Sequence, residues 1–243
     1  MKEKLGCIIL AAGKGKRMKS EIAKPLHKVA GLSMVSHVIK NAEALNPDKI
    51  VVVIGNDMDD LAQEVKPYET AIQNIANGTG GAVLAAKELF NGFDGDILIL
   101  YGDTPLVSTD TLQKMIDMRR SSSTVGLTFS GMNVESPNTY GRMILNDDGT
   151  LKKIVEFKEA SDEEKEISLC NGGIVCADGS KLFKWLEQIN NNNAKKEYYL
   201  TDLPVIAAKD NRQTYVVEVS TDEMSGANTP AELENLEKLI QTQ

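Results

Sequence analysis

The segment Leu10-Ala11-Ala12-Gly13-Lys14-Gly15-Lys16-Arg17-Met18 decides the fold of this chain, and Lys24-Pro25 follows shortly after it. An apolar run over residues 7–10 leads into the segment, as a buried strand leads into a loop. Glycines let backbone N–H groups approach a phosphate, and lysine and arginine side chains neutralise its charge. The stretch therefore predicts a strand followed by a phosphate-binding loop, which is typical of α/β folds.

The cations of this loop stand out because the chain as a whole is acidic, with a formal net charge of -8 over 243 residues. Between Gly13 and Lys28 the sequence holds a single acidic residue, Glu21. The positive charge is therefore a local feature, and it suits a compact polyanion such as a nucleoside triphosphate. The acidic balance excludes non-specific binding to nucleic acid, which needs a basic face.

Composition and cysteine usage indicate a cytoplasmic globular protein. Hydrophobic residues make up 42% of the chain and charged residues 26%, which is an ordinary soluble composition. The sequence has no run of 18 apolar residues, so we expect no membrane segment. The cysteines, Cys7, Cys170 and Cys176, show no C-x-x-C spacing, which indicates reduced thiols.

Short apolar runs alternate with helical patterns through the first half of the chain. The runs predict strands over residues 7–10, 50–54, 71–74, 96–100 and 124–129, and the patterns predict helices over 33–45, 58–65, 82–89 and 109–120. The run over 96–100 is continuously apolar, as expected of a strand covered on both faces. This order predicts a Rossmann-like, mostly parallel sheet with helices on both faces.

The second half predicts a lid of β-hairpins and helices over the carboxyl edge of that sheet. Strands over 142–145 and 151–155 flank an Asp-Gly turn and predict a hairpin, and the acidic residues 159–166 predict a loop or short helix. Further strands are predicted over 172–176 and 215–219, and helices over 180–189, 203–209 and 230–240. Ligands of open α/β sheets bind at the edge that this lid would cover.

Two common phosphate-binding motifs do not fit the loop. A Walker A loop requires a second glycine five residues after Gly13, where this chain has Met18. The dinucleotide fingerprint G-x-G-x-x-G matches Gly13 and Gly15 but also meets Met18 at its third glycine. A nicotinamide or flavin cofactor is therefore not indicated.

The loop instead belongs to a longer series of motifs that extends over nearly the whole chain. After the loop and Lys24, the series continues with Leu26-His27-x-x-Ala30-Gly31-x-x-Met34, Gln73, Gly78-Thr79-Gly80, Leu100-Tyr101-Gly102-Asp103-x-Pro105-Leu106, Thr139-Tyr140-Gly141-Arg142, Ile154-Val155-Glu156-x-Lys158, Asn171-x-Gly173-Ile174, Asn191-Asn192-Asn193-Ala194, Glu197-Tyr198-Tyr199-x-Thr201-Asp202 and Asn228. In this order they resemble the sugar-phosphate nucleotidyltransferases. The nearest resemblance is to the N-acetylglucosamine-1-phosphate uridylyltransferase domain of the bifunctional bacterial enzyme.

The resemblance implies a reaction and a division of the chain. In such an enzyme, N-acetylglucosamine 1-phosphate attacks UTP in the presence of Mg²⁺, and UDP-N-acetylglucosamine and pyrophosphate form. The product belongs to cell wall biosynthesis, for peptidoglycan and lipopolysaccharide. We expect a single domain over residues 1–243, with a nucleotide-binding half (1–130), a sugar-phosphate-binding half (131–229) and a C-terminal helix (230–243).

Cations and oxygen ligands are the expected catalytic groups. Arg17 and Lys24 are predicted to neutralise the triphosphate, whereas Lys14, Lys16 and Lys19 also fit a solvated charged face. Asp103 follows a buried strand, which would place its carboxylate beside the glycine loop as a Mg²⁺ ligand. A capping or turn role before Thr104-Pro105 is the alternative for Asp103. The resemblance implies Asn228 as the second metal ligand, although its spacing before Pro230 equally fits a helix cap.

The remaining site residues fall into two groups. The Gln73 amide can pair with the edge of a uracil base, and Gly78 lets the backbone approach the base closely. The alternative for Gln73 is an ordinary polar residue at the end of a strand. The nucleotide-binding group is Leu10, Ala11, Ala12, Gly13, Lys24, Gln73, Gly78, Thr79, Tyr101, Gly102 and Asp103. The resemblance implies a sugar-phosphate group made of Gly141, Glu156, Asn171, Tyr199, Thr201 and Asn228.

The sequence departs from the family pattern in three places. Lys16 replaces a threonine, and Ala76 and Gly81 replace a glutamine and a histidine beside the expected base pocket. These last two changes leave open a nucleotidyltransferase for another nucleotide or sugar phosphate, and a non-catalytic nucleotide-sugar sensor is a further alternative. No hexapeptide repeats occur, so we expect no acetyltransferase activity. The resemblance does not carry an oligomeric state to this chain.

Overall fold

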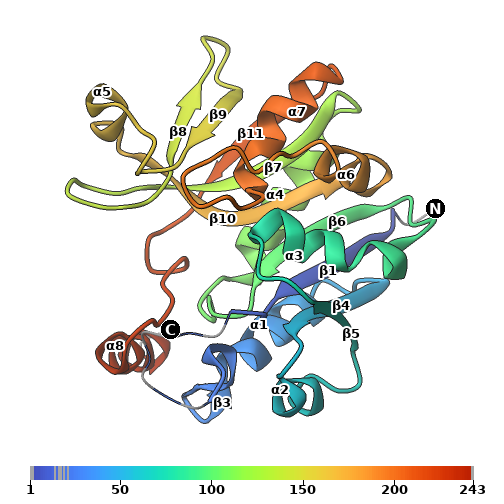
Figure 1. Ribbon diagram of the computed structural model, residues 1–243, viewed down its shortest axis with the longest axis vertical. Helices are drawn as coiled ribbons and strands as arrows, with labels where there is room; N and C mark the ends of the chain where they lie inside the picture. Colours follow the sequence, from blue (N-terminus) through green and yellow to red (C-terminus); the bar gives the residue numbers. More distant parts are fainter. Residues whose placement is uncertain (1–2, 14, 16–17, 19, 21, 242–243) are drawn as a thin grey trace.

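The apolar run at the start of the chain forms the central strand of a mixed sheet (Figure 1). The computed structural model describes residues 3–13, 15, 18, 20 and 22–241. Strand β1 (Leu5–Leu10) is buried along its whole length and pairs in parallel with β4 (Lys49–Gly55) on one side and β6 (Asp96–Tyr101) on the other. A strand with two neighbours and two covered faces requires the continuous apolar sequence seen here.

The main path of the sheet runs β11-β7-β10-β6-β1-β4-β5. The other strands on this path are β5 (Glu69–Gln73), β7 (Val125–Asn133), β10 (Leu169–Asp178) and β11 (Gln213–Glu218). Strand β10 is antiparallel to both β6 and β7, whereas the other pairs on this path are parallel. The prediction of a mostly parallel sheet is therefore confirmed.

Helices cover both faces, and the alternation of side chains along each strand divides the core in two. In β1, Cys7 and Ile9 face one core cluster, and Ile8 and Leu10 face the other. Helices α1 (Met34–Glu43), α2 (Asp59–Glu64) and α4 (Thr109–Arg120) cover the first face. Helices α3 (Thr79–Ala85), α6 (Gly179–Leu186) and α7 (Leu203–Lys209) cover the second.

The second half of the chain builds part of the main sheet as well as its cover. The predicted hairpin is present as β8 (Arg142–Leu145) and β9 (Leu151–Val155), with Gly149 in its turn at a φ of +81°. It joins the sheet through β10, and α5 (Asp162–Lys165) follows it. The second half therefore also supplies β10 and β11 to the main sheet, in addition to the predicted hairpin and helices.

The C-terminal helix packs against a small hairpin that the sequence patterns did not reveal. Strands β2 (Lys28–Val29) and β3 (Leu32–Ser33) are joined at Ala30 and Gly31, both of which have positive φ angles. Helix α8 (Pro230–Gln241) buries Leu236 with Val29 and Met34 from this region. The C-terminal helix and residues 29–34 therefore meet in one small apolar cluster.

Buried polar groups tie the sheet to its helices. The Asp96 carboxylate, at the start of β6, is 2% exposed and forms ion pairs with Arg119 (2.5 Å) and Arg120 (2.6 Å) from α4. The three cysteines are free thiols, all of them buried, and burial raises the pKa of Cys7 to about 12. Among the described residues, no helix has both the length and the apolar character that a bilayer crossing requires.

Candidate active site

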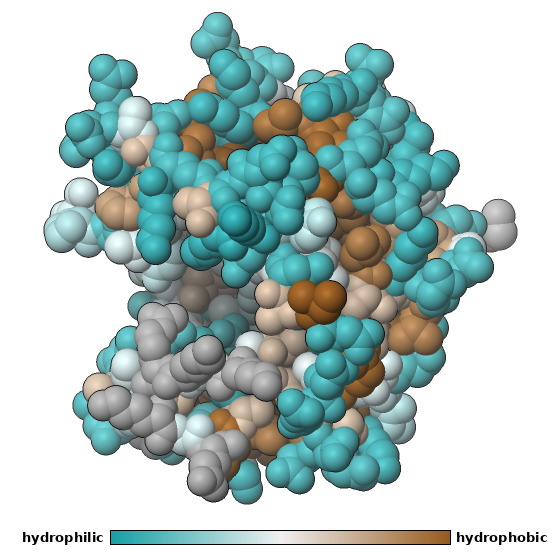
Figure 2. All heavy atoms as spheres, in the orientation of Figure 1, coloured by the Kyte–Doolittle hydropathy of each residue, from teal (hydrophilic) through white to brown (hydrophobic). Residues whose placement is uncertain are grey.

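The carboxyl ends of four parallel strands open into one cavity of about 720 Å³. Figure 2 shows the surface hollowed on this side of the molecule, between the part that carries β8 and β9 and the part that carries β3. The loops after β1, β4, β5 and β6 supply most of the lining. The lining residues are Leu10, Ala11, Ala12, Gly13, Gly15, Lys24, Pro25, Gly55, Asn56, Asp57, Gln73, Asn74, Ala76, Gly78, Thr79, Ala82, Tyr101, Asp103 and Glu197.

The glycine loop lines the cavity where the sequence placed it. The Ala11 N–H donates to the Val53 carbonyl (2.8 Å), so pairing with β4 continues one residue beyond β1. Gly15 has a φ of +56°, and a Cβ atom there would lie 2.6 Å from the Lys24 Cβ. The loop therefore needs glycine at this position to let Lys24 pass. Of the predicted cations, Arg17 lies outside the described residues, as do Lys14, Lys16 and Lys19.

Lys24 connects the two residues predicted to bind metal. Its Nζ atom donates to the Asp103 carboxylate and to the Asn228 side-chain oxygen (2.7 Å). The side chains of Lys24 and Asp103 are only 12% and 28% exposed, so solvent screens this ion pair weakly. The structure thus brings together two oxygen atoms whose residues lie 125 positions apart in the sequence (228 − 103).

Other residues fill the capping roles that were alternatives for Asp103 and Asn228. Ser108 caps α4, because its side chain accepts from the Thr111 N–H (3.1 Å). At α8, the Thr229 hydroxyl accepts from the Glu232 N–H (3.3 Å). The Asn228 side-chain oxygen is directed to Lys24 instead, while its own N–H groups donate to the Glu232 carboxylate.

Gln73 and Gly78 form a close-packed wall on the other side of the cavity. The Gln73 Nε2 atom donates to the Asn77 Oδ1 (3.2 Å) and to the Gly78 carbonyl (3.1 Å). Gly78 has a φ of +105°, and a Cβ atom there would lie 2.6 Å from the Tyr198 carbonyl oxygen. The Thr79 hydroxyl accepts from the Leu200 N–H (3.1 Å). Helix α3 begins at Thr79, three residues before the helix predicted over residues 82–89. The last part of that predicted helix forms a short 3-10 helix (Lys87–Phe90) instead.

Tyr101 and Gly102 play different parts at the end of β6. Tyr101 lines the cavity, and burial raises the pKa of its hydroxyl, with a further contribution from the Asp103 and Glu156 carboxylates. Gly102 donates its N–H to the Leu10 carbonyl (2.9 Å), and a Cβ atom there would lie 3.2 Å from the Ala11 Cβ. Gly102 therefore packs behind the cavity wall and supports the glycine loop.

The predicted sugar-phosphate residues other than Asn228, which lies at Lys24, gather on the side of Tyr101 next to the cavity. The Thr201 hydroxyl donates to the Glu156 carboxylate (3.2 Å), and a Cβ atom on Gly141 would lie 3.7 Å from the same carboxylate. Asn171 donates its N–H to the Gly141 carbonyl (2.9 Å), and its side chain accepts from the Gly173 N–H (3.0 Å). Gly173 in turn packs 3.1 Å from the Tyr101 ring, measured from the position of an added Cβ.

Carboxylates are concentrated in this second group. Burial raises the pKa of Asp202, and the neighbouring Glu159 and Glu156 carboxylates raise it further. Tyr199 is buried, and burial together with the same two carboxylates and Glu197 raises the pKa of its hydroxyl. Such a set of hydroxyl and carboxylate oxygens can accept hydrogen bonds from a sugar.

Several lining residues were missed by sequence reasoning. Gly55 is the last residue of β4, Asn56 and Asp57 follow it directly, and Asn74 follows β5. Both strands were predicted, so the rule that parallel strands end at one edge could have found these residues. Glu197 comes from the segment before Tyr198 and could not have been found in this way.

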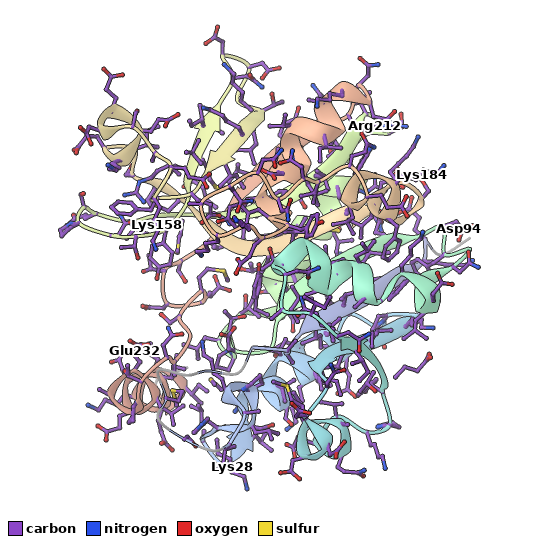
Figure 3. All side chains as sticks on the ribbon, in the orientation of Figure 1. Lys28, Asp94, Lys158, Lys184, Arg212 and Glu232 are labelled. Atoms are coloured by element: carbon purple, nitrogen blue, oxygen red, sulfur yellow. The ribbon has the colours of Figure 1, made fainter. Side chains whose placement is uncertain are left out.

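A second hollow, of about 620 Å³, lies away from these residues, between Phe90, Phe93 and Phe183. Figure 3 shows two of its lining residues, Asp94 and Lys184, on the opposite side of the molecule from Glu232 on α8. It lies beside the amino end of β6, where ligands of open α/β sheets do not usually bind.

Comparison with known proteins shows the family of this chain. A family model described as a MobA-like NTP transferase domain matches residues 7–164. The chain belongs to this nucleotidyltransferase family. Two curated relatives are the bifunctional protein GlmU of Paramagnetospirillum magneticum, 42% identical over 238 residues, and that of Rhodospirillum rubrum, 43% identical over 238 residues. The alignments cover 98% of this chain and 53% of each relative, so the chain spans about half the length of the curated relatives it matches.

Solved structures with the same fold include two that share little sequence with this nucleotidyltransferase. One is the CMP:2-keto-3-deoxy-manno-octonic acid synthetase complexed with CTP, with a TM-score of 0.73 and 16% identity. Another is a candidate glucose-1-phosphate thymidylyltransferase from Bacillus anthracis in complex with sucrose, with a TM-score of 0.75 and 18% identity. They cover 98% of this chain, and the alignments span 99% and 96% of theirs. At such low identity these likenesses show the fold alone.

Proposed function

We propose that this chain transfers UMP from UTP to N-acetylglucosamine 1-phosphate and releases pyrophosphate, with Mg²⁺ as cofactor. The observation that carries the proposal is the position of Lys24, which bonds to Asp103 and Asn228 at the wall of a cavity that the glycine loop also lines. About 40% identity to GlmU proteins and the motif series support uridylyl transfer.

The reaction requires positioning and charge more than it requires a nucleophilic side chain. An oxygen of the sugar 1-phosphate attacks the α-phosphorus of UTP, and the bond from this phosphorus to the oxygen that bridges to the β-phosphorus breaks. Pyrophosphate leaves with that oxygen, so no group becomes covalently attached to the protein. In this proposal the backbone N–H groups of Ala12 and Gly13 hold phosphate oxygens, and Lys24 neutralises charge that develops on them.

The groups around Lys24 suit a magnesium ion. Asp103 and Asn228 direct a carboxylate and an amide oxygen at one positively charged atom, and a hard divalent ion prefers the same two donors. Among the described residues there is no cluster of three or more histidine, cysteine, aspartate or glutamate side chains. Mg²⁺ often takes only one or two protein ligands and completes its shell with phosphates and water. When bound, it would supply positive charge to the phosphates of UTP.

The sugar 1-phosphate is assigned to the second group of residues. Glu156 and Thr201 already bond to each other, and both can also bond to sugar hydroxyls or to an acetamido N–H. A side chain at Gly141 would press against Ile154 (3.2 Å from the position of a Cβ atom) and would lie beside the Glu156 carboxylate, so glycine keeps this carboxylate accessible. Tyr101 lies between this group and the nucleotide cavity, so the two substrates would meet next to its ring.

A coupled assay for pyrophosphate tests the proposal. The purified chain should release pyrophosphate from UTP only when N-acetylglucosamine 1-phosphate and Mg²⁺ are present. Asp103→Asn should lower kcat at least about 100-fold, since it removes a charge that acts on the reacting phosphates. Asp110→Asn, an exposed aspartate in the first turn of α4, is the matched control and should keep full activity. Pyrophosphate release that survives in Asp103→Asn would contradict the proposal.

Two other functions remain as alternatives with their own outcomes. Ala76 lines the cavity at the place of a family glutamine, which favours testing CTP, dTTP and other sugar phosphates in the same assay. A higher rate with one of these would assign another nucleotidyl transfer. A nucleotide-sugar sensor would bind UTP or the nucleotide sugar in calorimetry and release no pyrophosphate with any pair.

A further inference from the structure

Asn77 lies in the turn between β5 and α3, and its side chain lies in the space beside Gly81, in the first turn of α3. A Cβ atom built on Gly81 would lie 1.9 Å from the Asn77 Oδ1 and 2.9 Å from its Nδ2. Contacts this short do not occur between real atoms, so the Asn77 amide occupies the place that a side chain at position 81 would need. The glycine at 81 is therefore matched to the asparagine at 77.

The Gly78 carbonyl and the Asn77 amide together hold the Gln73 amide in one direction. The Gln73 Nε2 atom has two hydrogens, and they are directed at the Gly78 carbonyl (3.1 Å) and at the Asn77 Oδ1 (3.2 Å). A backbone carbonyl can only accept, so the bond to Gly78 identifies the nitrogen end of the Gln73 amide. The end that is left for a ligand in the cavity is the carbonyl oxygen, Oε1, which can only accept.

We propose that Asn77 is a positioning residue that holds the Gln73 Oε1 toward the base and thereby selects a base with a ring N–H. This inference rests on the proposed nucleotidyl transfer and deepens it. Gln73 lines the cavity, while Asn77 acts through Gln73. Gly81 contributes by leaving the space in which the Asn77 amide lies.

The chemistry of the pyrimidines gives this arrangement its selectivity. Uracil carries a hydrogen on N3 and can donate it to Oε1, whereas cytosine has a lone pair on N3 that faces the same oxygen. Turning the Gln73 amide over to suit cytosine would lose the bond to the Gly78 carbonyl and would place Oε1 against that oxygen atom. It would also break the bond to Asn77, unless the Asn77 amide turned over with it. An unpaired polar group of this kind costs about tenfold in binding or more. Thymine also carries a hydrogen on N3, so Gln73, held by Asn77, selects UTP and dTTP over CTP.

Three substitutions test the proposal through the ratio of kcat/KM for UTP to kcat/KM for CTP. Asn77→Ala removes the acceptor and should lower this ratio by roughly tenfold, because one of the two bonds to Nε2 is lost. Asn77→Asp keeps an acceptor oxygen and should keep the ratio, even where its charge weakens both nucleotides. Gly81→Ala should displace the Asn77 side chain and lower the ratio as Asn77→Ala does. The double variant Asn77→Ala with Gly81→Ala should lower it no further than either change alone.

Binding measured by calorimetry separates this proposal from the proposed function. If the wild-type chain releases no pyrophosphate, the proposed function fails, and the ratio of the Kd values for CTP and UTP then replaces the kinetic ratio. A wild-type chain that binds CTP as well as UTP overturns the inference. An unchanged ratio in Asn77→Ala, with a thermal unfolding midpoint that shows a folded protein, overturns it as well. A ratio that falls equally in Asn77→Asp would show that only the fit at position 77 matters, and it would also overturn the inference.

Discussion

At Gly78, both the backbone conformation and a tertiary contact require glycine. Its φ of +105° disfavours any side chain, and the backbone of Tyr198 lies 2.6 Å from the position of a Cβ atom. Gly149 has a similar φ of +81° but open space around it. A comparison of the two positions therefore separates the strain of the backbone from the contact with Tyr198.

We expect Gly78→Ala to destabilise the fold by about 2 kcal/mol more than Gly149→Ala, because both changes carry backbone strain and only the first adds a clash. Gly78→Ala should also weaken UTP binding, since the residue lines the cavity. Urea unfolding gives the first quantity and calorimetry the second. Equal losses of unfolding free energy in the two variants would show that Tyr198 can move away from a Cβ atom at position 78 without destabilising the fold.

Asp202 is a half-buried carboxyl with two acidic neighbours. Burial raises its pKa, and the Glu159 and Glu156 carboxylates raise it further. A raised pKa means that the folded state holds this proton more tightly than the unfolded state does. The stability that this proton contributes is therefore present at low pH and is lost as the pH rises through the folded-state pKa.

We expect Asp202→Asn to unfold at a higher temperature than the wild type at pH 7, because it removes a partly buried negative charge. The difference should shrink as the pH falls, because the wild-type carboxyl, whose pKa is raised, then gains its proton. Thermal unfolding of both proteins between pH 4 and 7.5 measures this. Asp162→Asn, at an exposed position on α5, should give the same midpoint as the wild type throughout the range.

Residues that depend on one local motif could be predicted from the sequence, and those that depend on packing could not. Lys24 and the glycine loop were predicted because a strand that enters a cationic glycine segment has few interpretations. The bond from Lys24 to Asn228 could not be predicted from the sequence, because the two residues lie 204 positions apart and only the folded chain brings them together. Asn77 gave no signal, because its role arises from the missing side chain at Gly81.

Helix α8 holds Asn228 at the cavity through a short chain of contacts. The Asn228 N–H donates to the Glu232 carboxylate (2.7 Å), and one turn further on Leu236 is 1% exposed against β2 and α1. Leu233, Leu239 and Ile240 of the same helix pack around this cluster, in which Leu236 is the most deeply buried residue of α8. The burial of Leu236 therefore contributes to the position of the helix.

We expect Leu236→Ala to cost about 2 kcal/mol or more in the stability of α8, because it empties a buried site. Amide hydrogen exchange over residues 230–241 should become faster, and a higher Mg²⁺ concentration should be needed for half-maximal activity. Glu237→Ala, on the exposed side of the same helix, is the control. The same exchange rate in both variants would mean that Leu236 does not anchor the helix.

Elements with a strong apolar period were predicted well, and short elements were not. The central strands and α4 agree with their predicted ranges because burial on two faces or on one helical face leaves a clear pattern. The β2–β3 hairpin has only two residues in each strand, so no pattern could form. Helix α3 starts early because Gly78 and Gly80, poor helix residues by themselves, fit closely against Tyr198.

For the whole molecule, Asp96 is a point where three parts of the chain are joined. Its carboxylate pairs with Arg119 and Arg120, and Arg120 also donates to the carbonyl of Lys4 (3.3 Å), just before β1. One buried charge therefore connects β6, α4 and the start of β1. Removing it leaves two guanidinium groups without their shared partner.

We expect Asp96→Ala to lower the free energy of unfolding by about 3 kcal/mol, as breaking a buried ion pair generally does. Asp94→Ala removes an exposed partner of Lys4 two residues away and should have no measurable effect. Urea unfolding of both variants measures the difference. A loss for Asp96→Ala no larger than that for Asp94→Ala would show that the buried ion pair adds nothing to stability.

The burial of all three thiols gives the protein a built-in reporter of its own opening. A thiol reacts with maleimides as the thiolate, and a pKa of about 12 leaves Cys7 almost entirely protonated at neutral pH. Labelling at Cys7 on β1 and at Cys176 on β10 must therefore wait until the two central strands are exposed to solvent. The alkylation rate, followed by mass spectrometry with and without UTP, would show how far nucleotide binding suppresses such openings.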